Sequence, residues 1–113
     1  MIYLTANHII QMNQAVTGVV VDPERRQKVS SAFASVNYYD TIEERITCIV
    51  SAIIKNHYFL DGNKRTALFV YLVLCQLNSL KVNHTSSELA NIMEAIAVSS
   101  YNIEKFTEIL FKD

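Results

Sequence analysis

The feature that most limits the fold of this chain is its lack of helix-breaking residues. One proline and two glycines interrupt 113 residues, of which half are hydrophobic. Apolar side chains recur at the three- and four-residue spacing that places them on one helical face, as at Ile46, Ile49, Val50, Ile53 and Ile54. We find no repeat, low-complexity tract or linker. The sequence therefore predicts a single all-α domain over residues 1–113, with about six helices.

Capping signals divide the chain into these helices. Predicted helix starts lie at Thr5, at Asp22-Pro23, at Thr41 with Glu44, at Thr85 with Glu88, and near Asn102. A threonine followed three residues later by glutamate forms a capping box, which satisfies N–H groups of the first turn. The first helix should end near Gly18, and the helix from Thr41 should stop near Asn56. The apolar run 67–77 predicts a helix up to about Ser79, buried on most sides.

Residues 33–41, FASVNYYDT, break the helical periodicity. An asparagine, two tyrosines and an aspartate interrupt the apolar spacing there. This segment is the best candidate for an irregular or extended stretch.

Polar chemistry is concentrated in residues 57–66, HYFLDGNKRT, between two apolar helices. The unpaired N–H groups at the start of the second helix favour an anion. Gly62 permits a backbone conformation in which N–H groups point toward a ligand, and Asn63 can cap or brace that turn. Lys64 and Arg65 oppose the helix dipole, and an anionic ligand would remove that conflict.

An acid and a histidine extend this predicted anion site. Asp61 beside a phosphate is repulsive unless Mg²⁺ bridges the two, and Mg²⁺ commonly binds one or two carboxylates together with phosphate oxygens. His57 supplies an imidazole, the side chain that most often takes a proton from a hydroxyl at neutral pH. Each of these residues alone has an ordinary structural reading, as a loop histidine or a turn. Together they indicate phosphoryl or nucleotidyl transfer.

Composition argues against several other functions. The net charge of −1 and pI of about 6.3 give no general attraction for a nucleic-acid backbone. The run 67–77 is about half of what is needed to cross a bilayer. Cys48 and Cys75 lie in apolar helical patterns and read as small buried hydrophobes in a reducing compartment. Without a recognisable sorting signal, we expect a cytoplasmic protein.

The nine residues from His57 to Arg65 closely resemble the signature of the Fic/Doc superfamily, and the lysine before the arginine resembles Doc, the death-on-curing toxin. Looser similarity extends over LTANHII near the start, the Asp22-Pro23 helix, Tyr39-Asp40, and SSELANI after the motif. The resemblance implies a compact Fic-type helical bundle with the motif loop between two central helices.

The resemblance also implies a role for each motif residue. His57 would be the general base that deprotonates a target hydroxyl, Phe59 the loop anchor, and Asp61 the Mg²⁺ ligand. The phosphates of ATP would be bound by four consecutive residues: Gly62, Asn63, Lys64 and Arg65. Tyr38 and Tyr39 would belong to a flap against which a target peptide lies by strand addition.

Two departures from the family pattern favour one reaction over another. Fic enzymes that transfer AMP typically have glycine where this chain has Lys64, and a second arginine where it has Leu68. Doc shares both departures, which are associated with ATP bound in the reversed sense. The resemblance therefore favours transfer of the γ-phosphate to a threonine or serine, with elongation factor Tu as the family target. Transfer of AMP is the alternative.

The absence of two motifs bears on regulation and on a rival function. A self-inhibiting Ser/Thr-x-x-x-Glu-Gly/Asn motif is missing, since Ser100 and Glu104 are followed by Lys105. The chain thus resembles a toxin inhibited in trans by a partner like the antitoxin Phd. A HEPN-type RNase would need an arginine four to six residues before the histidine, whereas Arg45 lies twelve before His57. A catalytically inactive Fic-like binding module is the remaining alternative.

Overall fold

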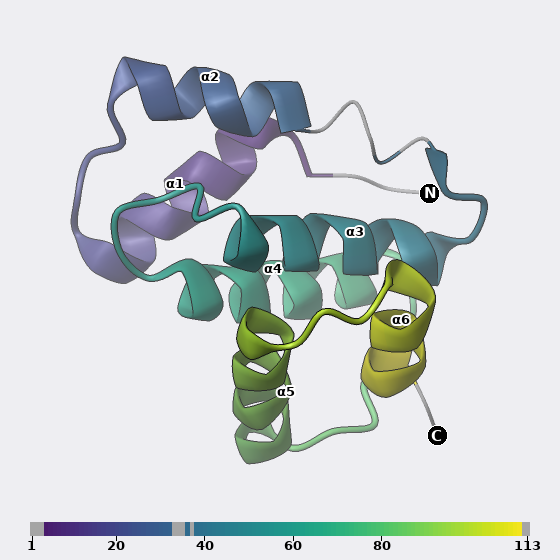
Figure 1. The fold of residues 1–113 in the computed structure, drawn as a ribbon. Helices are drawn as coiled ribbons and strands as arrows, with labels where there is room; N and C mark the ends of the chain where they lie inside the picture. Colours follow the sequence, from purple (N-terminus) through teal and green to yellow (C-terminus); the bar gives the residue numbers. More distant parts are fainter. Residues whose placement is uncertain (1–3, 33–35, 37, 112–113) are drawn as a thin grey trace.

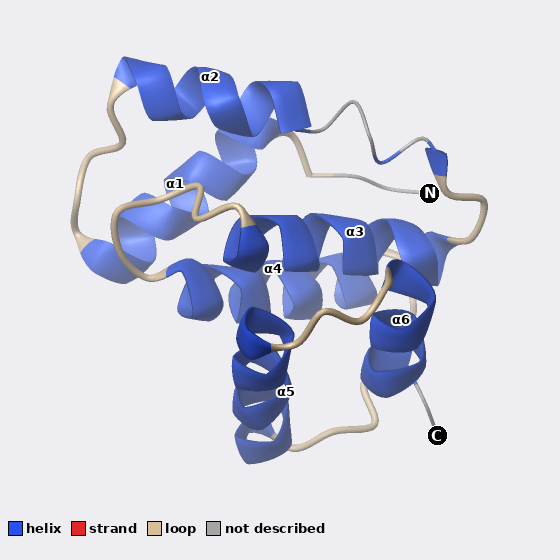
Figure 2. Ribbon diagram, in the orientation of Figure 1, coloured by secondary structure: helices blue, strands red, loops and turns tan. Residues whose placement is uncertain are grey.

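The computed structural model describes residues 4–32, 36 and 38–111, which form six helices and no strand (Figures 1 and 2). The helices are α1 (Ala6–Thr17), α2 (Pro23–Ala32), α3 (Ile42–Lys55), α4 (Asn63–Leu77), α5 (Ser86–Val98) and α6 (Ile103–Phe111). The all-α prediction of about six helices is confirmed. Within the predicted irregular segment, Tyr39 and Asp40 belong to no helix or strand, and residues 33–35 and 37 lie outside the described residues.

The predicted capping signals begin the helices as expected. Thr5, Thr41 and Thr85 are the N-caps of α1, α3 and α5, and each is part of a capping box. In α1 the reciprocal acceptor is the side chain of His8 instead of a carboxylate. Gly18 ends α1 in the left-handed conformation, with a φ of 73°. These local interactions set the helix lengths, and therefore where the loops fall.

Helix α3 lies at the centre of the bundle, where it packs against α4, α5 and α6 (Figure 1). Helix α1 covers α4, and α2 packs on α1. The face of α3 predicted to be apolar is buried, since its five isoleucine and valine residues are at most 3% exposed. The loop between α3 and α4 lies at one end of this central pair and contains the motif.

Helix α4 is less covered than its sequence predicts. Val70, Leu74 and Cys75 are fully buried, but Phe69 is 40% exposed and Leu72 39%. Helix α4 packs mainly against α1, α3 and α5, and Tyr71 also contacts Leu110 and Phe111 of α6, yet these neighbours leave one face open. The expectation that most of its sides are buried is therefore only partly correct, because a small bundle has too few helices to surround it.

Both cysteines are buried and neither forms a disulfide, as predicted from their apolar surroundings. Burial raises the pKa of the Cys75 thiol to about 11, so this residue stays a protonated, unreactive thiol at neutral pH. In the part of the chain that the structure describes, the helices are all too short or too polar to span a bilayer.

Candidate functional site

The motif loop turns the chain through two left-handed residues. After the C-cap Asn56, His57 has a φ of 47°, and Gly62 has a φ of 72° just before α4. Glycine adopts this conformation without penalty, whereas a residue with a side chain costs about 1–2 kcal/mol. The strained residue is the histidine predicted as the general base, and strain of this kind is concentrated at functional sites.

Two hydrogen bonds between the Asn63 side chain and the Phe59 backbone fix the conformation of the loop. The amide of Asn63 accepts a hydrogen bond from the Phe59 N–H through Oδ1 at 3.0 Å and donates to the Phe59 carbonyl through Nδ2 at 2.9 Å. The Phe59 side chain is 2% exposed, which suits its predicted role as an anchor. Asn63 thus braces the turn, and its side chain is already engaged. Its predicted contribution to an anion hole therefore rests on its backbone N–H.

Two side chains distant in sequence hold the loop from outside. Arg25 on α2 donates through Nη1 to the carbonyls of His57 and Tyr58, each at 3.4 Å. Asn13 on α1 donates through Nδ2 to the Asp61 carbonyl at 2.9 Å. Sequence reasoning did not assign either residue to the site. A polar amide among the apolar positions of α1 is the signal that could have identified Asn13, while Arg25 has no local signal.

The start of α4 differs from the other described helix starts. Thr5, Asp22, Thr41, Thr85 and Asn102 each accept a backbone N–H of the first turn at the starts of the other five helices. Helix α4 begins after Gly62 and has no side-chain cap. Within the described residues, the N–H groups of Asn63, Lys64 and Arg65 have no acceptor in the chain. An uncapped N-terminus of this kind is suited to an anion.

A cavity of about 350 Å³ opens at this uncapped helix start. Its lining residues are Ile54, His57, Asp61, Gly62, Asn63, Lys64, Arg65 and Ala97. The cavity thus brings together the predicted base, the predicted metal carboxylate and all four predicted phosphate-binding residues. The His57 side chain is exposed and has no hydrogen-bond partner among the described residues, so its imidazole is free to meet a substrate.

Carboxylates already contact the groups predicted to bind phosphate. Asp61 accepts the Gly62 N–H through Oδ1 at 2.7 Å, and its Oδ2 lies 3.8 Å from Nη2 of Arg65. Lys64 Nζ lies 2.7 Å from Oε1 of Glu94 on α5. These pairs are largely exposed, and such pairs are worth about 0–1 kcal/mol each. The conflict between the cations and the helix dipole is thus eased by carboxylates that a phosphate can displace.

Replacing Glu94 by glutamine is expected to tighten binding of inorganic pyrophosphate by up to about fivefold, since about 1 kcal/mol of competing ion pairing is removed. Calorimetric titration of both proteins measures the change. Glu104→Gln on α6 removes the same charge outside this cavity and is the matched control. An equal gain in the control would show an effect of net charge alone.

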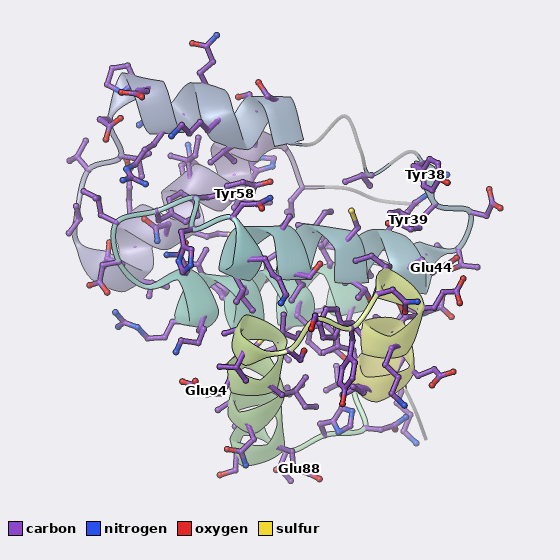
Figure 3. All side chains as sticks on the ribbon, viewed as in Figure 1. Tyr38, Tyr39, Glu44, Tyr58, Glu88 and Glu94 are labelled. Carbon is purple, nitrogen blue, oxygen red and sulfur yellow. The ribbon has the colours of Figure 1, made fainter. Side chains whose placement is uncertain are left out.

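The predicted flap residues lie at the other end of α3 from the motif loop. Tyr38 and Tyr39 precede the start of α3, whereas Tyr58 follows its end (Figure 3). Fourteen residues of helix place these ends about 21 Å apart. The carbonyl of Tyr39 is held by Arg45 Nε at 2.6 Å, so Arg45 also lies far from His57. The structure therefore does not bring the two tyrosines to the loop.

A larger cavity, of about 620 Å³, lies between the start of α3 and α6. Four glutamates line it: Glu43, Glu44, Glu104 and Glu108. Their negative charge repels phosphate, so this cavity does not suit a nucleotide.

Comparison with known proteins bears on the same part of the chain. The family model described as the Fic/DOC family matches residues 3–75, which include the motif loop and most of α4. A search of curated proteins found no match. The matched region holds every predicted site residue, while Glu94 lies beyond it. The chain therefore belongs to the Fic/DOC family, which supports a Fic-type transferase acting on proteins, and whose members generally use ATP as a substrate.

Proposed function

We propose that this protein is a Doc-type kinase, which transfers the γ-phosphate of ATP to a threonine or serine hydroxyl of a target protein. The observation that carries the proposal is the uncapped start of α4, which opens into the cavity lined by His57, Asp61, Lys64 and Arg65. A base, an acid, two cations and free N–H groups in one cavity are the groups that phosphoryl transfer requires.

The reaction assigns one task to each group. The imidazole of His57 removes the proton from the target hydroxyl, whose oxygen forms a bond to the γ-phosphorus. The bond between that phosphorus and the bridging oxygen breaks, and ADP leaves with the electron pair. The backbone N–H groups of Gly62 to Lys64 and the side chains of Lys64 and Arg65 balance the charge on the phosphate oxygens. The proton on His57 then returns to solvent.

Asp61 is the residue that would hold Mg²⁺. The described residues contain no group of three or more histidine, cysteine, aspartate or glutamate side chains suited to a metal. A single exposed carboxylate nevertheless fits Mg²⁺, which commonly completes its shell with nucleotide phosphates and water. The ion would neutralise phosphate charge. An Asp61 carboxylate turned toward a metal would also release the Gly62 N–H and Arg65 for the nucleotide.

Leu68 and Lys64 support phosphate transfer over AMP transfer. Leu68 is partly buried and packs against the core, so this position supplies no second arginine to the cavity. Lys64 occupies the position of the glycine found in AMP-transferring relatives. By the resemblance to Doc, this combination reverses the nucleotide and places the γ-phosphate at His57.

The target and the partner follow from the same resemblance. We propose elongation factor Tu as the first target to test, with its phosphorylation arresting translation. Because the sequence lacks the self-inhibiting motif, we also propose that a Phd-like antitoxin inhibits the protein in trans. Neither interaction involves nucleic acid or a membrane.

Intact mass of the target after incubation with the protein and Mg²⁺-ATP tests the proposal. A gain of about 80 Da means phosphate, and a gain of about 329 Da means AMP, from the masses of the transferred groups. Lys64→Gly is expected to shift the product toward AMP, since Lys64 is the residue on which nucleotide orientation is argued to depend. No mass gain on any candidate target with any nucleotide would contradict the enzyme proposal, and an unchanged product with Lys64→Gly would contradict the orientation argument.

A further inference from the structure

The buried polar residues of the core differ in what they bind. In the described part of the chain these are Asn13, Thr47, Ser51 and Thr66. Thr47 and Ser51 donate to carbonyls three or four residues away in α3, so their hydroxyl groups find hydrogen-bond acceptors within their own helix. Asn13 instead uses its side-chain nitrogen to join α1 to the motif loop and to the first turn of α4, at separations of 48 and 53 residues.

The side-chain amide of Asn13 donates both of its hydrogens. It is 2% exposed, and its Nδ2 donates to the Asp61 carbonyl at 2.9 Å and to Thr66 Oγ1 at 3.0 Å. An amide nitrogen carries two hydrogens, so both are used. A buried amide contributes little to stability in comparison with an apolar side chain, because its hydrogen bonds mostly offset the loss of water. The contact with Asp61 therefore calls for an explanation beyond packing.

The geometry of the peptide bond supplies that explanation. The C=O and N–H of a trans peptide lie in one plane and point in opposite directions. The Asp61 carbonyl and the Gly62 N–H belong to the same peptide. When Asn13 holds the carbonyl toward the core, the Gly62 N–H must point away from the core, where it meets the Asp61 carboxylate at 2.7 Å.

The packing of α1 leaves this peptide little other freedom. A Cβ at Gly62 would lie 2.5 Å from Cγ2 of Thr17 and 3.7 Å from Nδ2 of Asn13, so the loop backbone lies directly on α1. Gly62 lines the 350 Å³ cavity, whereas Asn13 does not. Asn13 thus acts on the cavity through the peptide that it holds.

We propose that Asn13 is a positioning residue, which aims the Gly62 N–H into the cavity and so sets where a phosphate group binds. The inference rests on the proposed function for its effect on transfer, but the orientation of the N–H is a property of the free protein. Because Asn13 is buried and does not line the cavity, it would act through this peptide and not by touching the nucleotide or the target.

Two variants isolate the contact with Asp61. Asn13→Leu removes both hydrogen bonds of the amide. Thr66→Val removes the bond to Thr66 and keeps the bond to Asp61, so it is the matched control at an equally buried position. Asn13→Asp has nearly the same size and places a carboxylate against the Asp61 carbonyl; it is the second variant if Asn13→Leu does not fold.

Hydrogen exchange of the two glycine amides gives a readout that is independent of activity. The chain has only two glycines, so labelling with ¹⁵N-glycine yields two amide signals. We expect the Gly62 amide to exchange several-fold faster in Asn13→Leu than in Thr66→Val. The Gly18 amide, which donates to the Gln14 carbonyl at 2.8 Å, should be unchanged and reports any general loosening. Equal acceleration of both signals, or none at Gly62, would overturn the proposal.

Kinetics then test the consequence for transfer. Asn13→Leu should lower kcat by about tenfold with KM for the target protein unchanged, because a misplaced phosphate slows the chemical step. Thr66→Val should keep kcat near the wild-type value, and a kcat in Asn13→Leu equal to that control would contradict the role in transfer. If the wild-type protein transfers nothing, the proposed function fails, and the exchange of Gly62 still decides whether Asn13 sets the N–H.

Discussion

Replacing His57 by alanine is expected to lower the rate of phosphate transfer by about 10²–10⁴-fold, the range that a positioned general base contributes. The physical reason is that the cavity offers no other free imidazole among its lining residues to take the proton of the hydroxyl. Single-turnover transfer followed by intact mass measures the loss. Binding of Mg²⁺-ATP should be unchanged, because the phosphate contacts come from α4 and not from the histidine.

His57→Gly separates the chemical role from the structural one. The histidine has a φ of 47°, a conformation that costs a residue with a side chain about 1–2 kcal/mol and glycine almost nothing. The glycine variant should therefore be as inactive as the alanine variant. Its free energy of unfolding, measured by urea titration, should be about 1 kcal/mol higher than that of the alanine variant. Leu60→Ala, at an exposed position of the same loop, is the control for activity. Transfer retained in either His57 variant would show that another group is the base.

Replacing Gly62 by alanine is expected to destabilise the protein by about 2–5 kcal/mol. Two costs add: about 1–2 kcal/mol for a side chain at a φ of 72°, and about 1–3 kcal/mol for forcing atoms into packed space. The new Cβ would lie 2.5 Å from Cγ2 of Thr17, so α1 and the loop must separate. Urea unfolding measures the loss. Affinity for pyrophosphate should fall with it, since the N–H groups at the start of α4 are displaced.

Gly18→Ala is a matched control for this change. Its φ of 73° is close to the 72° of Gly62, but a Cβ there meets nothing within 4 Å. It should therefore cost only the conformational term, about 1–2 kcal/mol. Thr17→Ser removes Cγ2 and keeps the hydroxyl that donates to the Asn13 carbonyl at 2.9 Å, so it should partly restore stability to Gly62→Ala. Equal losses at the two glycines, without such recovery, would contradict the steric argument.

Much of the fold could be predicted because its helix boundaries depend on neighbours in sequence. The capping boxes at Thr41 and Thr85 join residues three apart, and the apolar spacing along α3 identified its buried face. The predicted end of α4 differs from the observed one. The helix stops at Leu77 and not at Ser79, which has a positive φ of 56°. Its open face was missed because periodicity shows which residues are apolar but not how many helices are available to cover them.

The chemistry of the candidate site is likewise local. His57, Asp61, Gly62, Lys64 and Arg65 lie within nine residues, so any fold that places a loop before α4 gathers them in one cavity. The predicted flap shows that closeness in sequence does not always bring residues to the same site. Tyr38 and Tyr39 precede the motif by fewer than twenty residues, but a rigid helix of about 21 Å lies between them and the loop.

The amino-acid sequence by itself determined the helices, their caps and the reactive groups of the loop, because hydrogen bonds and periodicity within a few residues decide them. Only the tertiary structure decided which side chains hold that loop. Asn13 and Arg25 contact it from α1 and α2, and Glu94 of α5 contacts Lys64 at the start of α4, at separations of 30 residues or more. Such contacts depend on how helices pack against one another, and no pattern in the chain records the direction in which a distant side chain points.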